Sequence, residues 1–166
     1  RILHELQRGG QVFVVHDRVQ TIQPLAARIE ALVPEATVGV GHGQMEKGAL
    51  EKVLVRFVRA EIRVLVCTTI IESGIDMPGV NTILVNRAHR MGLAQLYQLR
   101  GRVGRGHLRG YCTLIVPDEQ DRLTKKAVHR LQVLQDNQEL GAGMQVATAD
   151  MELRGSGDLL GDSQHG

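Results

Sequence analysis

The chain has 166 residues, of which 43% are hydrophobic, and its formal net charge is +2. This length is suited to one domain with a buried core and a small appendage. Its apolar runs are far shorter than the roughly 20 residues of a membrane-spanning helix, so we expect no contact with a membrane.

The first residues, RILHELQRGG, contain neither an initiator Met nor the charged and then apolar pattern of a signal peptide. We therefore expect the chain to be a fragment of a longer protein.

Five short β-branched runs predict strands, at residues 11–15, 37–40, 63–68, 81–86 and 110–116. Helical patterns lie between most of them, with apolar residues at i, i+3, i+4 and i+7 from Ile22 and again from Leu50. Apolar strands that alternate with helices are typical of a parallel sheet covered on both faces. The sequence therefore predicts an α/β domain over residues 1–117.

The alternation of strands and helices ends at Pro117. Residues 118–136 indicate one amphipathic helix, with an inner stripe formed by Leu123, Ala127, Leu131 and Leu134. A segment flanked by glycines, 141–155, and a Gly-rich tail follow, without any strand signal. We expect residues 118–166 to form a helical appendage.

The positive charge of the chain is concentrated in one segment. Between Met77 and Pro117 there is no Asp, Glu or Lys, but there are six arginines, namely Arg87, Arg90, Arg100, Arg102, Arg105 and Arg109. A solvated surface is the ordinary explanation of a one-signed block. All basic residues of this block except histidine are arginines, whose planar, fork-shaped guanidinium groups suit the oxygen atoms of phosphate. We therefore predict an anion-binding role.

A helical pattern also covers residues 93–105, in the middle of the arginine block. Leu96, Leu99 and Val103 would form its apolar stripe, together with Arg100. Gln98, Arg102 and Arg105 would share the opposite face. Gly101 and Gly104 would let a ligand approach this row, at a helix cost of about 1 kcal/mol each.

Ligands of α/β sheets bind beyond the carboxyl ends of the strands. We expect three segments there, namely 41–45, 67–78 and the arginine block. Thr68 and Thr69 could donate to phosphate oxygens, and Asp76 could accept from a ribose hydroxyl. Ordinary turn chemistry is the alternative explanation of these residues.

Neither an ATP-binding loop nor a metal site is predicted within the chain. Residues 43–48 have the GxxxxG spacing of a P-loop, but Ala49 and Leu50 stand where Lys and Ser or Thr are required. Cys67 and Cys112 lie in predicted strands without zinc-binding spacing. We expect them to be buried thiols of a cytoplasmic protein.

Together these segments resemble the second RecA-like motor domain of superfamily 2 helicases and translocases. The sequence QLRGRVGR (98–105) matches the QxxGRxGR motif, and VLVCTTIIESGIDMP (64–78) resembles the motif that precedes it. The segments DMELRGSGDLLG (150–161) and QHG (164–166) are similar to the helical hairpin and hook known as the TRG motif. RecG-type helicases and bacterial transcription-repair coupling factors share that motif, and LVPEATVGVGHGQM (32–45) is closer to the coupling factors.

The resemblance implies a RecA-like fold, with ATP and Mg²⁺ held mainly by an upstream P-loop domain that this chain lacks. The fragment alone is therefore expected to be inactive. Arg102 and Arg105 would reach the γ-phosphate, Gln98 would position them or the attacking water, and Gly74 and Asp76 would contact the nucleotide.

The resemblance also implies double-stranded DNA as a partner, gripped by its backbone through His42, Gly43, Thr68 and Thr69. Arg130, Arg154 and Gln164 would couple ATP turnover to movement. RNA polymerase and repair proteins would bind to other domains. Three alternatives stay open, namely a RecG-type branch-migrating helicase, an RNA helicase and a non-catalytic module that binds phosphate or nucleic acid.

Overall fold

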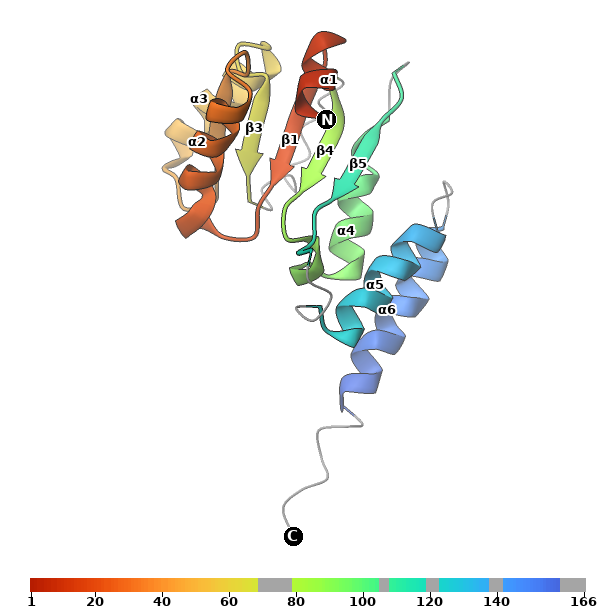
Figure 1. Ribbon diagram of the computed structural model, residues 1–166. Coiled ribbons are helices and arrows are strands. Elements are labelled where there is room, and N and C mark those ends of the chain that lie inside the picture. The colour runs from red at the N-terminus through yellow and green to blue at the C-terminus, as the bar shows by residue number, and fades with distance from the viewer. Residues whose placement is uncertain (69–78, 105–107, 119–122, 138–141, 159–166) are drawn as a thin grey trace. The chain divides into compact units, whose positions relative to one another are not determined.

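The computed structural model describes residues 1–68, 79–104, 108–118, 123–137 and 142–158, without the side chains of 154 and 156–158 (Figure 1). The chain forms two compact units. The first comprises Arg1–Ala88 and Leu99–Val116, and the second comprises His89–Gln98 and Pro117–Gly166. The domain boundary after residue 117 stays a prediction.

The first unit is built on a five-stranded sheet in the order β2-β3-β1-β4-β5. Every neighbouring pair of strands is parallel. The strands are β1 (Gln11–Val15), β2 (Val38–Gly41), β3 (Val64–Cys67), β4 (Val80–Val85) and β5 (Tyr111–Leu114). All residues of β1, β3 and β4 are buried, as the apolar runs predicted, and the α/β class is confirmed.

Helices cover both faces of this sheet. Val12 and Val14 of β1 point to one face, where they pack with α2 (Ile22–Leu32) and with Ile2 and Leu6 of α1 (Ile2–Gln7). Phe13 points to the other face and stacks on Phe57 of α3 (Lys47–Val58), with 5.1 Å between ring centroids. The short 3-10 helix η1 (Val19–Thr21) leads into α2.

The second unit contains α5 (Lys125–Asp136) and α6 (Gly143–Asp158), which lie side by side (Figure 1). On α5, Ala127 and Leu134 of the predicted stripe are buried. The helix begins only at Lys125, so the predicted start at residue 118 is wrong and Leu123 lies before the helix. The hydroxyl of Thr124 accepts a hydrogen bond from the Ala127 N–H at 3.1 Å and caps the helix. Within the described residues, no helix has the length and apolarity to cross a membrane.

Each of the two remaining helices contains a point at which the chain passes from one unit to the other. The 3-10 helix η3 spans Ala88–Arg90, and α4 spans Leu93–Arg100. Leu93, Leu96 and Leu99 are buried on α4. Leu96 and Leu99 belong to the predicted apolar stripe, whereas its third member, Val103, follows the end of the helix and is half-buried.

Candidate functional site

The helix α4 ends at Arg100, before the position that its sequence pattern predicted. The Arg102 N–H donates to the Leu99 carbonyl at 3.1 Å, a bond to the third residue back that tightens the last turn. Gly104, four residues beyond the end of α4, has φ +80°, which glycine adopts more readily than other residues. Arg102 is therefore carried by a turn, so the prediction that it lies on the same helical face as Gln98 is wrong, and Arg105 lies outside the described residues.

The turn that carries Arg102 packs against the residue before β5. A Cβ built on Gly110 would lie 2.5 Å from the nitrogen and 2.7 Å from the Cα of Gly104. Because Gly110 directly precedes β5, the Arg102 turn lies at the amino edge of the sheet, where the strands begin. The expectation that the whole arginine block follows the carboxyl ends is thus wrong for Arg102. A connection between parallel strands must return to the amino end of the next strand.

The opposite edge of the sheet carries His42, Gly43 and Thr68. The strands β2 and β3 are neighbours, and their last residues, Gly41 and Cys67, are paired. The residues that directly follow these strands, His42 and Thr68, therefore lie side by side. The Thr68 N–H donates to the Gly41 carbonyl at 3.3 Å. Gly43 is exposed, and a Cβ built on it would meet no atom within 4 Å. The structure therefore brings these three predicted residues together at the carboxyl edge.

A polar cluster that the sequence reasoning missed lies at the same carboxyl edge, where β1 and β4 end. His16 is buried, its Nε2 is 2.7 Å from the Thr21 hydroxyl, and its Nδ1 accepts from the Asn86 amide at 3.1 Å. The Asp17 carboxylate lies 3.9 Å from the Arg87 guanidinium. In the sequence, this cluster is indicated only by two polar pairs, His16–Asp17 after the first strand and Asn86–Arg87 after the fourth.

Burial lowers the pKa of His16, and the Arg87 and Arg18 charges lower it further, while Asp17 opposes the change. His16 is thus held in its neutral form. Arg87 has φ +56°, which is uncommon for a residue with a side chain. Such backbone strain often accompanies functional sites, and the guanidinium of Arg87 is exposed at the carboxyl edge, after β4.

Comparison with known proteins identifies the family of this domain. The family model described as the helicase conserved C-terminal domain matches residues 1–107. The chain belongs to this helicase family.

Relatives of this helicase domain are similar over nearly its whole length. The transcription-repair-coupling factor of Myxococcus xanthus is 54% identical over 99% of the chain, and that of Escherichia coli strain K12 is 50% identical over 99%. In each case the chain spans only 14% of the relative.

Solved structures show the same fold. The structure of RecG bound to a three-way DNA junction is 34% identical, with a TM-score of 0.77, and the match covers 99% of this chain and 21% of that one. The C-terminal domain of the DEAD-box protein Dbp5 is 19% identical, with a TM-score of 0.60, over 81% of this chain and 75% of that one. The latter likeness concerns the fold alone.

The structure of the helicase domain places some of the other predicted residues. Gln98 is exposed on α4. Arg130 on α5 is half-buried and donates to the His89 carbonyl at 2.9 Å. Arg154 belongs to α6, but its side chain lies outside the described residues. The other predicted residues outside the described part are Thr69, Gly74, Asp76, Arg105 and Gln164.

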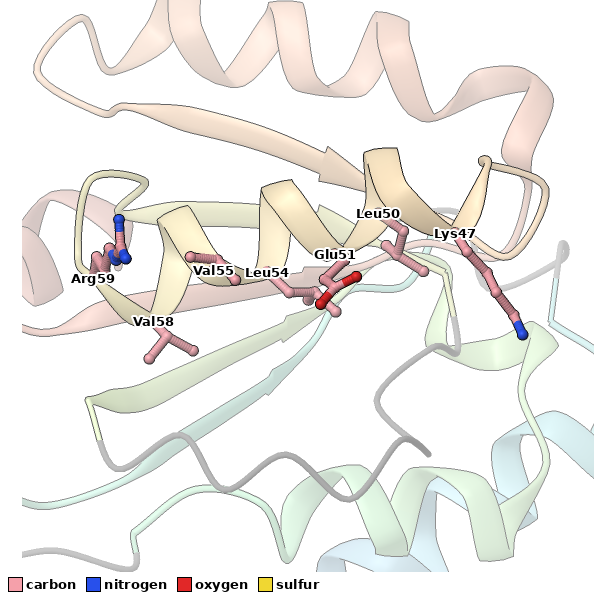
Figure 2. A pocket seen from close by; sticks show the side chains of 7 residues that line it. All are labelled: Lys47, Leu50, Glu51, Leu54, Val55, Val58 and Arg59. Atoms are coloured by element: carbon pink, nitrogen blue, oxygen red, sulfur yellow. The ribbon is translucent and has the colours of Figure 1, made fainter.

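The described part of the helicase domain contains no group of three His, Cys, Asp or Glu side chains that could hold a metal ion. A pocket of about 450 Å³ runs along α3, lined by Leu50, Leu54, Val55 and Val58 between Lys47 and Arg59 (Figure 2). Among the residues that the structure describes, none of the predicted site residues lines this pocket. The candidate sites are therefore the two edges of the sheet.

Proposed function

We propose that this chain is the second motor domain of an ATP-dependent translocase of superfamily 2. The whole protein would move along double-stranded DNA and displace stalled RNA polymerase in transcription-coupled repair, in the cytoplasm. One observation carries this proposal. The turn with Arg102 lies at one edge of the sheet, and His42 and Thr68 lie at the opposite edge of the same sheet. The names of the relatives support the coupling-factor assignment.

At the amino edge, Arg102 would face a nucleotide held by a P-loop domain elsewhere in the protein. A guanidinium is permanently charged and suits phosphate oxygens, so the residue fits this role. When bound with Mg²⁺, ATP supplies the phosphoryl group that is transferred to water. Arg102 and Arg105 would stabilise the developing charge, Gln98 would orient them, and Gly74 and Asp76 would contact the nucleotide.

At the carboxyl edge, the backbone of duplex DNA would be bound by His42, Gly43, Thr68 and Thr69. Hydroxyl and N–H donors bind phosphates of any sequence, as a translocase requires. The exposed Gly43 leaves room for a sugar–phosphate backbone to approach. Because one rigid sheet joins both edges, a movement of the domain on ATP binding would also move its grip on DNA.

The full-length protein with Arg102→Ala tests the proposal. We expect the DNA-stimulated kcat of ATP hydrolysis to fall about 10³-fold, as for arginine fingers that act on a transferred phosphoryl group. Arg59→Ala, on the exposed end of α3, is the matched control and should leave turnover unchanged. Near wild-type turnover with weakened DNA binding in Arg102→Ala would instead support a non-catalytic phosphate-binding module.

The coupling role of the hairpin residues needs a second experiment. Arg130 already ties α5 to the His89 carbonyl. Arg130→Ala and Arg154→Ala should retain ATPase activity but lose displacement of a triplex-forming strand. Lys126→Ala, exposed on the same helix, is the control. Loss of both activities together would argue for a structural role of these arginines.

A RecG-type helicase is the second candidate, because the RecG structure is similar over 99% of the chain. Displacement of a stalled RNA polymerase and migration of a branched DNA junction, measured side by side, distinguish the two. Stronger ATPase stimulation by RNA than by duplex DNA would contradict both and favour an RNA helicase.

A further inference from the structure

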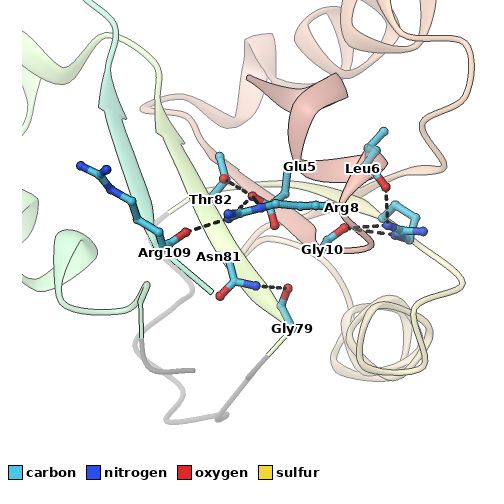
Figure 3. Close-up of polar contacts among 9 residues, drawn as sticks. Glu5, Leu6, Arg8, Gly10, Gly79, Asn81, Thr82 and Arg109 are labelled. Carbon is cyan, nitrogen blue, oxygen red and sulfur yellow. Dashed lines mark hydrogen bonds and ion pairs between the residues drawn. The ribbon is translucent and has the colours of Figure 1, made fainter. Parts of the chain in front are cut away.

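The first helix of the chain buries a carboxylate at the amino edge of the sheet. Glu5 on α1 is 0% exposed. Its Oε2 accepts two hydrogen bonds from the Arg8 guanidinium, at 2.7 and 3.0 Å, and one from the Thr82 hydroxyl of β4 at 2.5 Å (Figure 3). A buried charge is strongly unfavourable unless it is paired and hydrogen-bonded. This pairing therefore determines where Arg8 lies.

Arg8 makes a second contact, across the sheet edge. Its Nη2 donates to the backbone carbonyl of Arg109 at 2.8 Å, so one guanidinium joins α1 to the residue two positions before β5 (Figure 3). The Arg8 guanidinium also lies over the Tyr111 ring, 5.1 Å from its centroid. The start of β5 is thus held from α1 by a charged hydrogen bond and a cation–π contact.

The close packing between α1 and β1 depends on Gly10. A Cβ built on Gly10 would overlap the Glu5 carboxylate. Arg63 separately holds this corner, donating to the Gly10 carbonyl at 2.8 Å and to the Leu6 carbonyl at 3.3 Å. Arg63 thus anchors the end of the same helix through two backbone carbonyls, and within the described residues it does not bond to Arg109.

We infer that the Glu5–Arg8 pair is a positioning element for Arg102. Arg8 fixes the Arg109 carbonyl, and the next residue, Gly110, packs backbone to backbone on Gly104. Gly104 ends the turn that carries Arg102. The inference rests on the proposed function, because it assigns the pair to the arginine that would act on the nucleotide. A displacement of about 1 Å in a catalytic group can cost 10²-fold in rate.

Arg8→Lys in the full-length protein separates positioning from stability. The ammonium keeps a positive charge beside Glu5, but it is a point charge and lacks the planar fork that serves both Glu5 and Arg109. We expect kcat to fall about tenfold, with little change in the KM for ATP or in the melting temperature. Arg63→Lys is the matched control, because it makes the same change in a guanidinium that holds the end of the same helix from the residue before β3, and its kcat should stay near wild type.

A double-mutant cycle tests whether the pair acts through Arg102. In an Arg102→Ala background, Arg8→Lys should cause no further fall in kcat. The inference is overturned if Arg8→Lys stays within about twofold of wild type, if Arg63→Lys matches its loss, or if the effects of Arg8→Lys and Arg102→Ala multiply.

The same cycle distinguishes failure of the inference from failure of the proposed function. If Arg102→Ala alone leaves turnover unchanged, the proposed function fails, and the inference fails with it. If Arg102→Ala abolishes turnover while Arg8→Lys does not reduce it, only the inference fails.

Discussion

Gly110 packs its backbone directly on that of Gly104, with room for no side chain at position 110. This contact joins the turn after α4 to the beginning of β5, and it is the reason that Arg102 lies at the amino edge of the sheet.

Replacing Gly110 with Ala should displace the Arg102 turn. The new Cβ would lie 2.5–2.9 Å from backbone atoms of Val103 and Gly104, which cannot move aside as a flexible side chain would. We expect a loss of about 1–3 kcal/mol in the free energy of unfolding, measured by urea denaturation, as for other overpacked sites. In the full-length protein, the ATPase kcat should also fall.

Gly48→Ala is the control for that substitution. Gly48 lies in α3, and a Cβ built on it would meet no atom within 4 Å. Alanine there should stabilise the chain by about 0.5–1 kcal/mol through its helix propensity. Equal effects of the two substitutions would contradict the close packing described at Gly110.

The stability of the chain should depend on pH through His16. Its pKa is lowered by burial in the folded state, so the unfolded chain binds the proton more readily. The stabilisation from neutral His16 is complete above its ordinary pKa of 6.5 and is lost as the pH falls from 6.5 toward the folded-state value. Denaturation midpoints should be measured between about pH 5 and 8, the range in which histidine titrates. Below about pH 6.5, the midpoint of His16→Asn should fall less steeply with pH than that of the wild type. Identical slopes would show that the pKa of His16 does not change on folding.

Thr124→Ala should destabilise α5. The lost side chain accepts the Ala127 N–H at the first turn, and such caps contribute about 1 kcal/mol. Thr124→Ser retains the hydroxyl and should stay close to wild type. Thermal unfolding followed by far-ultraviolet circular dichroism would reveal the difference, and an equal loss in both variants would exclude the cap as its cause.

The two cysteines should resist alkylation in the folded chain. Burial raises the pKa of Cys67 to about 12 and that of Cys112 to about 11, so little thiolate exists near neutral pH. Cys67 is buried as expected from the sequence, whereas Cys112 is half-buried. Iodoacetamide at pH 8, followed by mass spectrometry, should modify Cys112 before Cys67 and both rapidly in denaturant. Rapid native labelling of Cys67 would contradict its burial in β3.

Much of this protein was predictable from local patterns. The β-branched runs and the helical periodicity placed the five strands and the helices α2, α3 and α5, because burial on a sheet or helix repeats at short, regular intervals. Short strands separated by helical connections also implied a parallel sheet. The order of the motifs indicated the helicase family, which the match over residues 1–107 confirms.

The tertiary structure decided what depends on contacts distant in sequence. The pattern continued the helix through Arg105, but α4 ends at Arg100, and the turn that follows brings Gly104, with φ +80°, against Gly110. The bond from Arg8 to Arg109 spans 101 residues, and no periodicity indicates it. The sequence alone determined which groups the domain carries. Only the packing of the chain decided which edge of the sheet each group occupies, because an edge is formed by segments that come together after folding.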